Sequence, residues 1–572
     1  MPKYPKKKLA QLLMQSCIDH GIEQVVISPG SRNAPLTLGF VNHPGVEAFS
    51  IVDERCAAFF AMGMAQQSGK PVALLCTSGS ALLNYYPAIA EAYYSKIPMV
   101  VISADRPKHL IDIGDGQTIR QAGAFSNHIC FETDLESEDG ITDEAEIDRM
   151  LSNNAIEIDR ALRIAHGSMG PVHINIPFDE PLYETVDHLY DFDSISVQKD
   201  SGPADSLLKE TPLPLSELEK FASIWNGSEK KMVLIGSSFP DELLQTQMEH
   251  LIKDPSVILL TETTSNVAHH SFIHKIDQLI FPLKDEDFEQ LKPEILLSFG
   301  GMIVSKKIKQ FLRKFPATEH WHVDAHKAMD TYLSLTHHFE ISAQLFFSQF
   351  FFLTENRKSA YQKKWLLLKE LRHMKHEEFL KNAVYADLKV FDMVLPSLPR
   401  NTNLQLSNSS IIRYAQLFDI DSSIKVFCNR GASGIDGSTS TALGAALAQK
   451  EQTVLITGDI SFLYDSNALW NNYIRDDFRI IVINNSGGGI FRFIPGPKSS
   501  DALDFFETPH NLNASALCTM FGFDYHTAEN SEELEYQLKD FYAASDKPAL
   551  LEIFTPRETN DMILASYFKA LN

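Results

Sequence analysis

Two short stretches near the carboxyl end of the sequence carry residues that could hold a hard metal ion. The first reads Gly458-Asp459-Ile460-Ser461, and the second, after the apolar run 479–483, reads Asn484-Asn485-Ser486-Gly487-Gly488-Gly489. Mg²⁺ prefers oxygen ligands in near-octahedral order and keeps phosphate oxygens in its shell. Asp459, Asn485 and the carbonyl of Gly487 could therefore supply three ligands and leave room for a diphosphate. Ordinary turn chemistry is an equal alternative for these stretches alone, because Asn and Gly favour turns.

A second group of polar residues follows apolar runs in the first 110 residues. These are Ser31 and Arg32 after one run, Glu54 after the next, Ser78 after a third and Arg106 after a fourth. Each falls where a predicted strand ends. For Glu54, a surface glutamate at a helix start is the simpler interpretation from sequence alone, since the helix dipole favours an acid there.

The elements that position these residues are short apolar strands alternating with helices. In the first part of the chain the predicted strands are Gln24–Ser28, Ala48–Val52, Val72–Cys76, Met99–Ser103 and Pro171–Ile176. Such alternation predicts an α/β fold with a doubly wound parallel sheet covered on both faces. Ligands of these sheets bind beyond the carboxyl ends of the strands, where the polar residues lie.

The same alternation occurs twice more along the chain. The middle part is predicted to contain strands 232–235, 257–261, 295–299 and 320–323, and a charged helical stretch from Asn356 to Lys381 follows. The last part is predicted to contain strands 404–406, 426–428, 453–457, 479–483 and 549–554. We therefore predict three doubly wound domains: 1–189, 190–355, and 356–572 with the linker helix.

Composition narrows the class of protein. The 572 residues are 44% hydrophobic and 22% charged, with a net charge of −23, which describes a soluble globular protein and argues against nucleic acid or an anionic membrane as partner. Six scattered cysteines without a CxxC pair suggest buried reduced thiols in the cytoplasm. The basic start lacks a continuous apolar segment, so neither a signal peptide nor membrane insertion is expected.

Several motifs together resemble a known family. The pieces are Ser28-Pro29-Gly30-Ser31-Arg32-Asn33-Ala34-Pro35, Asp53-Glu54-Arg55, Thr77-Ser78-Gly79-Ser80-Ala81, Ala104-Asp105-Arg106-Pro107, 116–121, 429–437 and 484–491. Their layout resembles thiamine diphosphate enzymes of the pyruvate-oxidase type. More closely, it is similar to the 2-succinyl-5-enolpyruvyl-6-hydroxy-3-cyclohexene-1-carboxylate synthases (the MenD family) of menaquinone biosynthesis. One departure is Ile460, which replaces the third glycine usual in the metal motif.

The resemblance implies a cofactor, thiamine diphosphate with Mg²⁺ or Mn²⁺, and roles for individual residues. Glu54 is the implied catalytic acid, hydrogen-bonded to the pyrimidine ring so that the cofactor's own amine acts as the base. The implied metal ligands are Asp459, Asn485 and Gly487. The other implied cofactor-binding residues are Ser78, Gly79, Ile435 as an apolar wedge, Gly458, Ile460, Ser461, Gly488, Ile490 and Phe491.

The resemblance also implies the reaction, that of a transferase acting as a carboligase. The family decarboxylates 2-oxoglutarate and adds the resulting succinyl carbanion to isochorismate. These substrates carry four carboxylates, and arginine binds carboxylates through two parallel hydrogen bonds. The implied substrate-binding residues are Ser31, Arg32, Arg106, Gln117, Lys306, Ser409, Arg413 and Arg430.

In this class of enzyme the first domain of one subunit meets the third domain of another. A homodimer or homotetramer with the active site at the subunit interface is therefore expected. Two alternatives stay open from sequence: another thiamine diphosphate-dependent decarboxylase or carboligase with a different acceptor, and a non-catalytic relative that binds a metabolite. Retention of both Glu54 and Asp459 speaks against the second, because a binding protein needs no catalytic acid.

Overall fold

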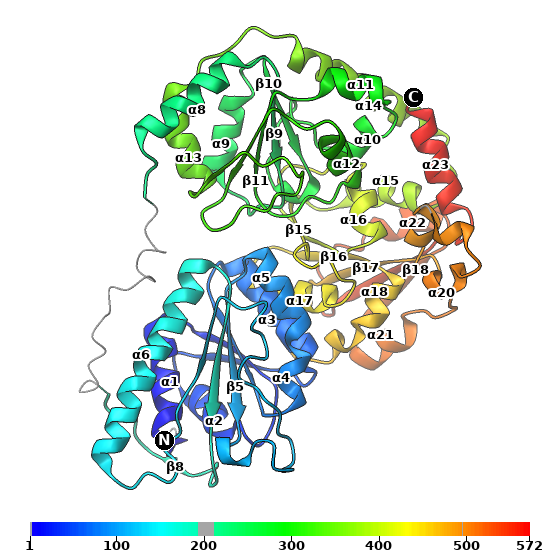
Figure 1. The fold of residues 1–572 in the computed structure, drawn as a ribbon. Coiled ribbons are helices and arrows are strands. Elements are labelled where there is room, and N and C mark those ends of the chain that lie inside the picture. Colours follow the sequence, from blue (N-terminus) through cyan, green and yellow to red (C-terminus); the bar gives the residue numbers. More distant parts are fainter. Residues whose placement is uncertain (1–2, 193–210, 495) are drawn as a thin grey trace. The chain divides into compact units, whose positions relative to one another are not determined.

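The structure is a computed structural model that describes residues 3–192, 211–494 and 496–572 (Figure 1). The chain forms two compact units. Unit 1 contains the described residues up to 192 together with 431–450 and 464–478, and unit 2 contains 211–430, 451–463 and 479–572. Each unit is described by itself below.

Unit 1 is built on a six-stranded parallel sheet in the order β3-β2-β4-β5-β7-β6. Its strands are β2 (Gln24–Ile27), β3 (Glu47–Ser50), β4 (Val72–Cys76), β5 (Met99–Asp105), β6 (Phe131–Asp134) and β7 (Pro171–Pro177). Its main helices are α1 (Lys8–Asp19), α2 (Ala34–Asn42), α3 (Glu54–Ser68), α4 (Ser80–Asn84), α5 (Tyr86–Ser95), α6 (Glu144–Ser168) and α17 (Ser438–Ala448). The short strands β1 (Tyr4–Pro5) and β8 (Thr185–Val186) pair antiparallel.

Helices α3 and α17 cross at very close range. A Cβ atom placed on Gly63 of α3 would lie 2.0 Å from the carbonyl oxygen of Thr441, and one on Gly444 of α17 would lie 1.9 Å from that of Phe60. Glycine at both positions lets the two backbones touch. The result is a helix α3 that is buried on nearly all sides.

Unit 2 contains the other two sheets. The middle sheet is parallel, in the order β10-β9-β11-β12-β13, with strands β9 (Lys231–Ile235), β10 (Val257–Thr261), β11 (Ile295–Phe299), β12 (Glu319–Val323) and β13 (His337–Phe339). Around it lie α8 (Leu215–Gly227), α9 (Glu242–Leu251), α10 (Ile276–Ile280), α11 (Asp285–Leu291), α12 (Lys306–Lys314), α13 (Ala343–Phe350) and α14 (Tyr361–Lys381).

The last sheet is parallel, in the order β15-β14-β16-β17-β19-β18. Its strands are β14 (Asn403–Leu406), β15 (Lys425–Cys428), β16 (Thr453–Gly458), β17 (Arg479–Asn484), β18 (Asp524–Ala528) and β19 (Ala549–Phe554). The helices of this part are α15 (Asp387–Ser397), α16 (Ser410–Ala415), α18 (Asp459–Tyr464), α19 (Ile490–Phe493), α20 (Leu503–Glu507), α21 (Ser515–Phe521), α22 (Ser531–Leu538) and α23 (Asn560–Ala570).

The first and last sheets have the same topology. In each, the first strand of the sheet in sequence lies between the second and the third, and the sixth lies between the fourth and the fifth. The predicted α/β class with doubly wound parallel sheets is therefore confirmed. The repetition also makes β2, β3, β4 and β5 the counterparts of β14, β15, β16 and β17.

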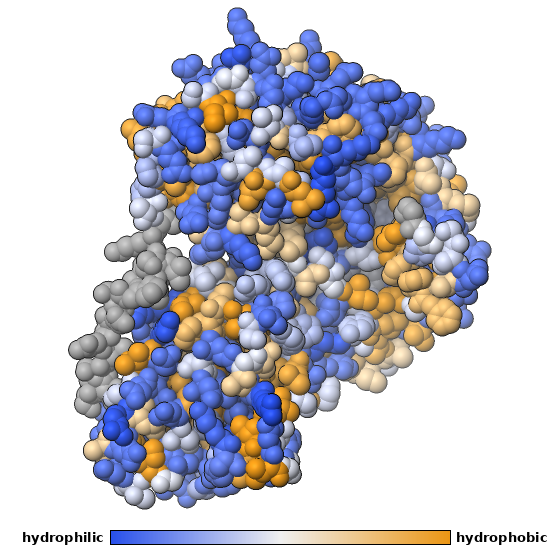
Figure 2. Space-filling view, viewed as in Figure 1, coloured by the Kyte–Doolittle hydropathy of each residue, from blue (hydrophilic) through white to orange (hydrophobic). Residues whose placement is uncertain are grey.

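The face of the molecule drawn in Figure 2 is mostly polar. Figure 2 shows hydrophilic side chains over most of the visible face and hydrophobic ones in separate patches. Five of the six cysteines are buried, Cys130 is exposed, and all six are free thiols. No helix among the described residues combines the length and the apolar character that crossing a membrane requires.

Candidate active site

In unit 1 the predicted residues lie on loops after β2, β3, β4 and β5. The loops after β2 and β4 touch, since a Cβ on Gly30 would lie 2.2 Å from the Cβ of Thr77. Arg32 is buried, its Nη1 donates to the carbonyl of Phe178 at 2.8 Å, and its Nε has no hydrogen-bond partner among the described residues. Ser31 beside it is exposed. Arg32 Nη2 lies 3.6 Å from Oε1 of Glu180, so the guanidinium already has one acidic neighbour and keeps one unused donor from which a further anion could accept a hydrogen bond.

Glu54 is the first residue of α3 and is half-buried. Helix α3 begins there because the side chain of Asp53 accepts a hydrogen bond from the backbone N–H of Cys56. The Nδ2 of Asn84 donates to Glu54 Oε2 at 3.1 Å. The carboxylate thus stands at a helix start with one polar neighbour.

The turn after β4 is held against the segment 116–121. Gly79 has φ +89°, its N–H donates to Gln121 Oε1 at 2.8 Å, and a Cβ there would lie 3.2 Å from the carbonyl oxygen of Gln117. Ser78 is buried, and Gln117 is exposed. Arg106 Nη2 donates to the carbonyl of Gly116 at 2.9 Å. Unit 1 therefore brings Ser78, Gly79, Arg106 and Gln117 into one neighbourhood.

The loop with Ile435 also belongs to unit 1, and a buried acid that the sequence analysis missed anchors it. Glu91 of α5 accepts hydrogen bonds from the backbone N–H groups of Gly431, Ala432 and Ser433 at 2.5, 2.7 and 3.1 Å. Ile435 is half-buried two residues further on. Three donors to one carboxylate fix the loop that presents this side chain.

In unit 2, Asp459 connects the two predicted metal stretches. It is buried at the start of α18, directly after β16, and its Oδ2 accepts a hydrogen bond from the N–H of Gly487 at 2.9 Å. Its Oδ1 accepts from the N–H of Ile460 at 2.7 Å. His510, which was not predicted, places Nε2 3.2 Å from Asp459 Oδ2.

Asn485, in the second predicted metal stretch, has a buried oxygen without a hydrogen-bond partner among the described residues. Its side chain is buried, its Nδ2 donates to Asp387 Oδ2 at 3.0 Å, and its Oδ1 accepts no hydrogen bond from any residue that the structure describes. A buried acceptor left unpaired costs about 1–3 kcal/mol. A cation bound to this oxygen would remove that cost.

The donor set fits a hard divalent cation. Across residues 3–192, 211–494 and 496–572, no three His, Cys, Asp or Glu side chains gather as a metal site. A metal here would instead be held by one carboxylate (Asp459), one amide oxygen (Asn485) and one carbonyl (Gly487). Oxygen ligands of this mixed kind suit Mg²⁺ or Mn²⁺.

Glycine is required at position 487. Its φ is +153°, and a Cβ there would lie 2.8 Å from the carbonyl oxygen of Glu507. The N–H of Gly488 donates to that same carbonyl at 2.7 Å. Ile490 and Phe491 follow on α19, both half-buried, with the Phe491 ring 5.5 Å from that of Phe506.

The substrate-binding residues predicted in unit 2 are also neighbours. Arg413 Nη1 donates to the carbonyl of Ser409 at 2.5 Å, and Arg430 Nη1 donates to Asn408 Oδ1 at 2.6 Å. Burial lowers the pKa of Arg413, and the positive charge of Arg430 nearby lowers it further. An anion bound near both guanidiniums would offset the repulsion between their charges.

Helix α16, which carries Arg413, runs past the metal stretch. A Cβ on Gly458 would lie 3.9 Å from Cγ1 of Ile411 on that helix. Ser461, in the first turn of α18, is buried. The proposed substrate arginines and the proposed metal ligands of unit 2 are therefore parts of one region.

Lys306 is exposed at the start of α12, whose N-terminus is held by a buried acid. Glu262 accepts hydrogen bonds from the N–H groups of Val304 and Ser305 at 2.6 and 2.7 Å. Burial raises the pKa of Glu262 to about 7, although the two backbone hydrogen bonds and Arg430 oppose the shift. Lys309, one turn along α12, interacts electrostatically with both Arg413 and Arg430 and was not predicted.

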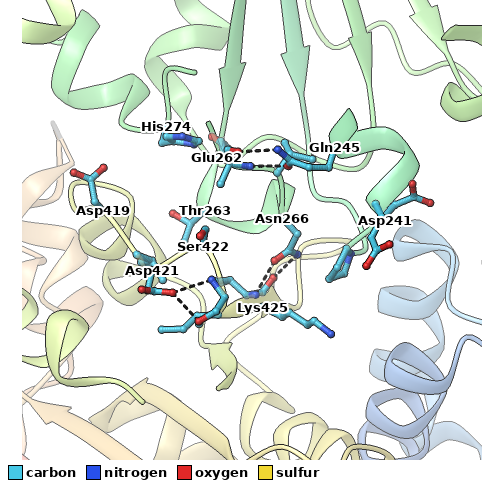
Figure 3. Close-up of a pocket in the computed structure, with 18 of the residues that line it drawn as sticks. Asp241, Gln245, Glu262, Thr263, Asn266, His274, Asp419, Asp421, Ser422 and Lys425 are labelled. Carbon is cyan, nitrogen blue, oxygen red and sulfur yellow. Dashed lines mark hydrogen bonds between the residues drawn. The ribbon is translucent and has the colours of Figure 1, made fainter. Parts of the chain in front are cut away.

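A large cavity in unit 2 lies elsewhere. It has a volume of about 870 Å³ and lies between the loops after β9 and β10 and the segment 418–426. Figure 3 shows its polar lining, including Asp241, Gln245, Asn266, Asp421 and Lys425. None of the predicted site residues lines it, although Glu262, which holds the start of α12, does.

Comparison with protein families defines the class. Residues 7–128 match the family model described as "Thiamine pyrophosphate enzyme, N-terminal TPP binding domain". Residues 216–406 match the model described as "Middle domain of thiamine pyrophosphate". Residues 409–553 match the model described as "Thiamine pyrophosphate enzyme, C-terminal TPP binding domain". The chain thus has the three domains of a thiamine diphosphate (thiamine pyrophosphate) enzyme.

Full-length relatives narrow the class to one family. The chain is 51% identical to the 2-succinyl-5-enolpyruvyl-6-hydroxy-3-cyclohexene-1-carboxylate synthase of Flavobacterium psychrophilum, over 99% of this chain and 100% of that protein. It is 38% identical to the synthase of the same name from Porphyromonas gingivalis, over 99% of this chain and 97% of that protein. The chain belongs to the 2-succinyl-5-enolpyruvyl-6-hydroxy-3-cyclohexene-1-carboxylate synthase family.

Proposed function

We propose that the protein joins 2-oxoglutarate to isochorismate with loss of CO₂, giving 2-succinyl-5-enolpyruvyl-6-hydroxy-3-cyclohexene-1-carboxylate in menaquinone biosynthesis. The full-length identity to synthases of that name is the observation that carries the proposal. The unpaired, buried oxygen of Asn485 near Asp459 supports it, because such an enzyme needs a cation to hold the cofactor's diphosphate.

Thiamine diphosphate supplies the decarboxylation and carbon–carbon bond-forming chemistry when it is bound. We assign Asp459, Asn485 and the carbonyl of Gly487 to Mg²⁺, with Mn²⁺ as a substitute. Around the diphosphate we place residues of β16, α18 and α19 and of the glycine turn before α19: Gly458, Ile460, Ser461, Gly488, Ile490 and Phe491. The apolar Ile490 and Phe491 keep water away from the reacting atoms.

The pyrimidine end is assigned to residues of unit 1. Glu54 holds a proton at the pyrimidine ring nitrogen, and Ser78 and Gly79 contact the same ring. Ile435 would serve as the apolar wedge against the bound cofactor. The hydrogen bonds from residues 431–433 to Glu91 support this assignment, since they hold the Ile435 loop in one conformation.

The substrates are bound through their carboxylates. Ser31, Arg32, Arg106 and Gln117 form one polar set in unit 1, and a second set in unit 2 contains Lys306, Ser409, Arg413 and Arg430. Because the whole chain has a net charge of −23, anionic substrates depend on these local positive charges. The electrostatic repulsion between Arg413 and Arg430 supports the binding of a carboxylate near both.

The proposal includes an assembly. Glu54 lies in unit 1 and Asp459 in unit 2, and we propose that the pair around each cofactor comes from two chains of a homodimer or homotetramer. We propose domain boundaries at 189/190 and 355/356. The acidic chain would act in the cytoplasm on small molecules, without nucleic acid or membrane insertion.

An assay that omits one component at a time tests the function. Purified protein with thiamine diphosphate, Mg²⁺, 2-oxoglutarate and isochorismate should release one CO₂ per isochorismate consumed, and omission of any component should stop turnover. CO₂ release that is equally fast without isochorismate would instead favour a decarboxylase or a carboligase with another acceptor. A protein that binds neither thiamine diphosphate nor Mg²⁺ would be a non-catalytic relative.

A further inference from the structure

Two consecutive asparagines at the end of β17 have closely similar surroundings. The Nδ2 of Asn484 donates to Glu552 Oε1 at 2.7 Å, and the Nδ2 of Asn485 donates to Asp387 Oδ2 at 3.0 Å. Both acids are buried, Glu552 with 1% and Asp387 with 2% of its surface exposed. In each pair a carboxylate therefore fixes which end of the amide faces it, since a carboxylate only accepts hydrogen bonds.

The two amides differ in what their oxygens do. Asn484 Oδ1 accepts a hydrogen bond from the N–H of Ser486 at 3.0 Å, so this side chain is fully used in structure. Asn485 Oδ1 is buried and accepts no hydrogen bond from the described part of the chain. Among the described residues, the second amide is thus held with its oxygen free for a ligand that they do not provide.

Asp387 is itself fixed by other parts of unit 2. It is the first residue of α15, its Oδ1 accepts a hydrogen bond from Thr555 Oγ1 at 2.6 Å, and its backbone N–H donates to Asn560 Oδ1 at 2.9 Å. Its carboxylate is also close enough to Asp459 for the two negative charges to interact. Two carboxylates and an unpaired amide oxygen in one buried place are stabilised by a cation.

We propose that Asp387 is the positioning residue of the metal site: it turns the Asn485 amide so that Oδ1 faces the cation of the bound cofactor. This inference rests on the proposed function, because that function supplies the cation. Without the carboxylate the amide could rotate by half a turn and present its nitrogen, which repels a metal ion. Partners that orient a metal ligand typically contribute 10- to 100-fold in affinity, about 1.4–2.7 kcal/mol.

The test compares Asp387→Asn with Glu552→Gln. The second variant makes the same acid-to-amide change in the partner of the neighbouring Asn484. Calorimetry measures Mg²⁺ affinity at a fixed concentration of thiamine diphosphate, with no substrate present. We expect Asp387→Asn to weaken Mg²⁺ binding about 10- to 100-fold and saturating Mg²⁺ to restore cofactor binding. Glu552→Gln should change Mg²⁺ affinity by less than about 3-fold, because Asn484 binds no ligand in this account.

Equal Mg²⁺ affinity in wild type and Asp387→Asn would overturn the inference, as would an equal loss in Glu552→Gln. If Asp387→Asn does not fold, Thr555→Val replaces it, since it removes only the hydroxyl that holds Asp387. That variant should weaken Mg²⁺ binding in the same direction by a smaller factor, and unchanged affinity would overturn the inference. A wild-type protein without any Mg²⁺-dependent cofactor binding would instead overturn the proposed function.

Discussion

At the scale of single residues, the account depends on a few side chains at the ends of parallel strands. Their types and positions are visible in the sequence because each proposed site residue follows an apolar strand, as at Arg32, Glu54 and Asp459. Their supporting residues are not. Glu91, Asp387 and Glu552 come from helices or strands distant in sequence and are recognised only through the hydrogen bonds that they accept.

His510 and Lys309 were missed for a related reason. Each lies in a segment without a motif, and its possible role depends on residues that are distant in sequence. His510 lies beside Asp459, and Lys309 interacts with Arg413 and Arg430. A lone histidine or a surface-type lysine on a charged helix carries no such signal in a single sequence.

Glu54 gives the first prediction. Glu54→Gln removes the acidic proton that the proposed mechanism needs, so kcat should fall at least ~100-fold. Binding of thiamine diphosphate, measured by calorimetry, should change little, since the metal ligands remain. Glu47→Gln on β3 makes the same acid-to-amide change at an exposed position and is the control. A kcat within about 3-fold of wild type would remove Glu54 from the catalytic role.

Arg413 gives the second prediction. Arg413→Ala should raise KM for 2-oxoglutarate by at least ~10-fold, a loss of about 1.4 kcal/mol or more, because it removes one of two adjacent guanidiniums. Steady-state kinetics at saturating isochorismate measure the change. The exposed Arg400→Ala should leave KM unaltered. If Arg413→Ala has the KM of the wild type, Arg413 does not bind this substrate.

At the scale of elements, the sequence predicted central strands far better than edge strands. In the three parallel sheets the strands missed were β6, β18 and β13, and each lies at the edge of its sheet; the short pair β1 and β8 was also missed. An edge strand is covered incompletely, and most residues of these three are half-buried rather than buried. They therefore lack the continuous apolar run that marks a central parallel strand. Predicted boundaries elsewhere differ by one or two residues, apart from the linker helix, which begins at Tyr361 rather than Asn356.

The crossing of α3 and α17 gives an element-scale prediction. Gly63→Ala forces a methyl group against the backbone of α17, which should cost about 1–3 kcal/mol and lower the thermal midpoint by several degrees. Gly227→Ala on α8 is the matched control, because its Cβ would meet nothing within 4 Å and alanine favours helix. Equal thermal midpoints in Gly63→Ala and wild type would contradict the close contact between α3 and α17.

The first and last sheets of the molecule have the same topology, and each carries part of the proposed site residues. Residues after β2 to β5 in unit 1 correspond to residues after β14 to β17 in unit 2, so Glu54 after β3 corresponds to the segment with Arg430 after β15. The sequence predicted three repetitions of alternating strands and helices. It could not predict that 431–450 and 464–478 belong to unit 1, because that depends on the packing of α17 on α3.

The raised pKa of a buried acid, Glu262, makes the stability of the protein depend on pH. Glu262 has a pKa of about 7 in the folded protein and 4.5 ordinarily, so between these values the folded state holds a proton that the unfolded state has lost. The free energy of unfolding should therefore fall as pH rises from about 4.5 to 7, by up to about 1.4 kcal/mol per pH unit from this group.

Glu262→Gln isolates this contribution, while Asp277, which interacts with Glu262, remains. Urea unfolding at pH 5, 6 and 7 should show the variant gaining stability relative to wild type as pH rises. The exposed Glu286→Gln on α11 should show no such trend. A constant difference between Glu262→Gln and wild type across this range would contradict the assignment.

The central claim is that an acid of unit 1 and a metal ligand of unit 2, from different chains, serve the same cofactor. Mixing Glu54→Gln with Asp459→Ala protein, after dissociation and reassembly, tests it most directly. If the two residues come from different chains, half of the dimers are mixed and each contains one intact site, so activity should rise to about a quarter of wild type. If each site is built from one chain, every site in the mixture is defective, and activity that stays at the level of the separate variants would contradict the claim.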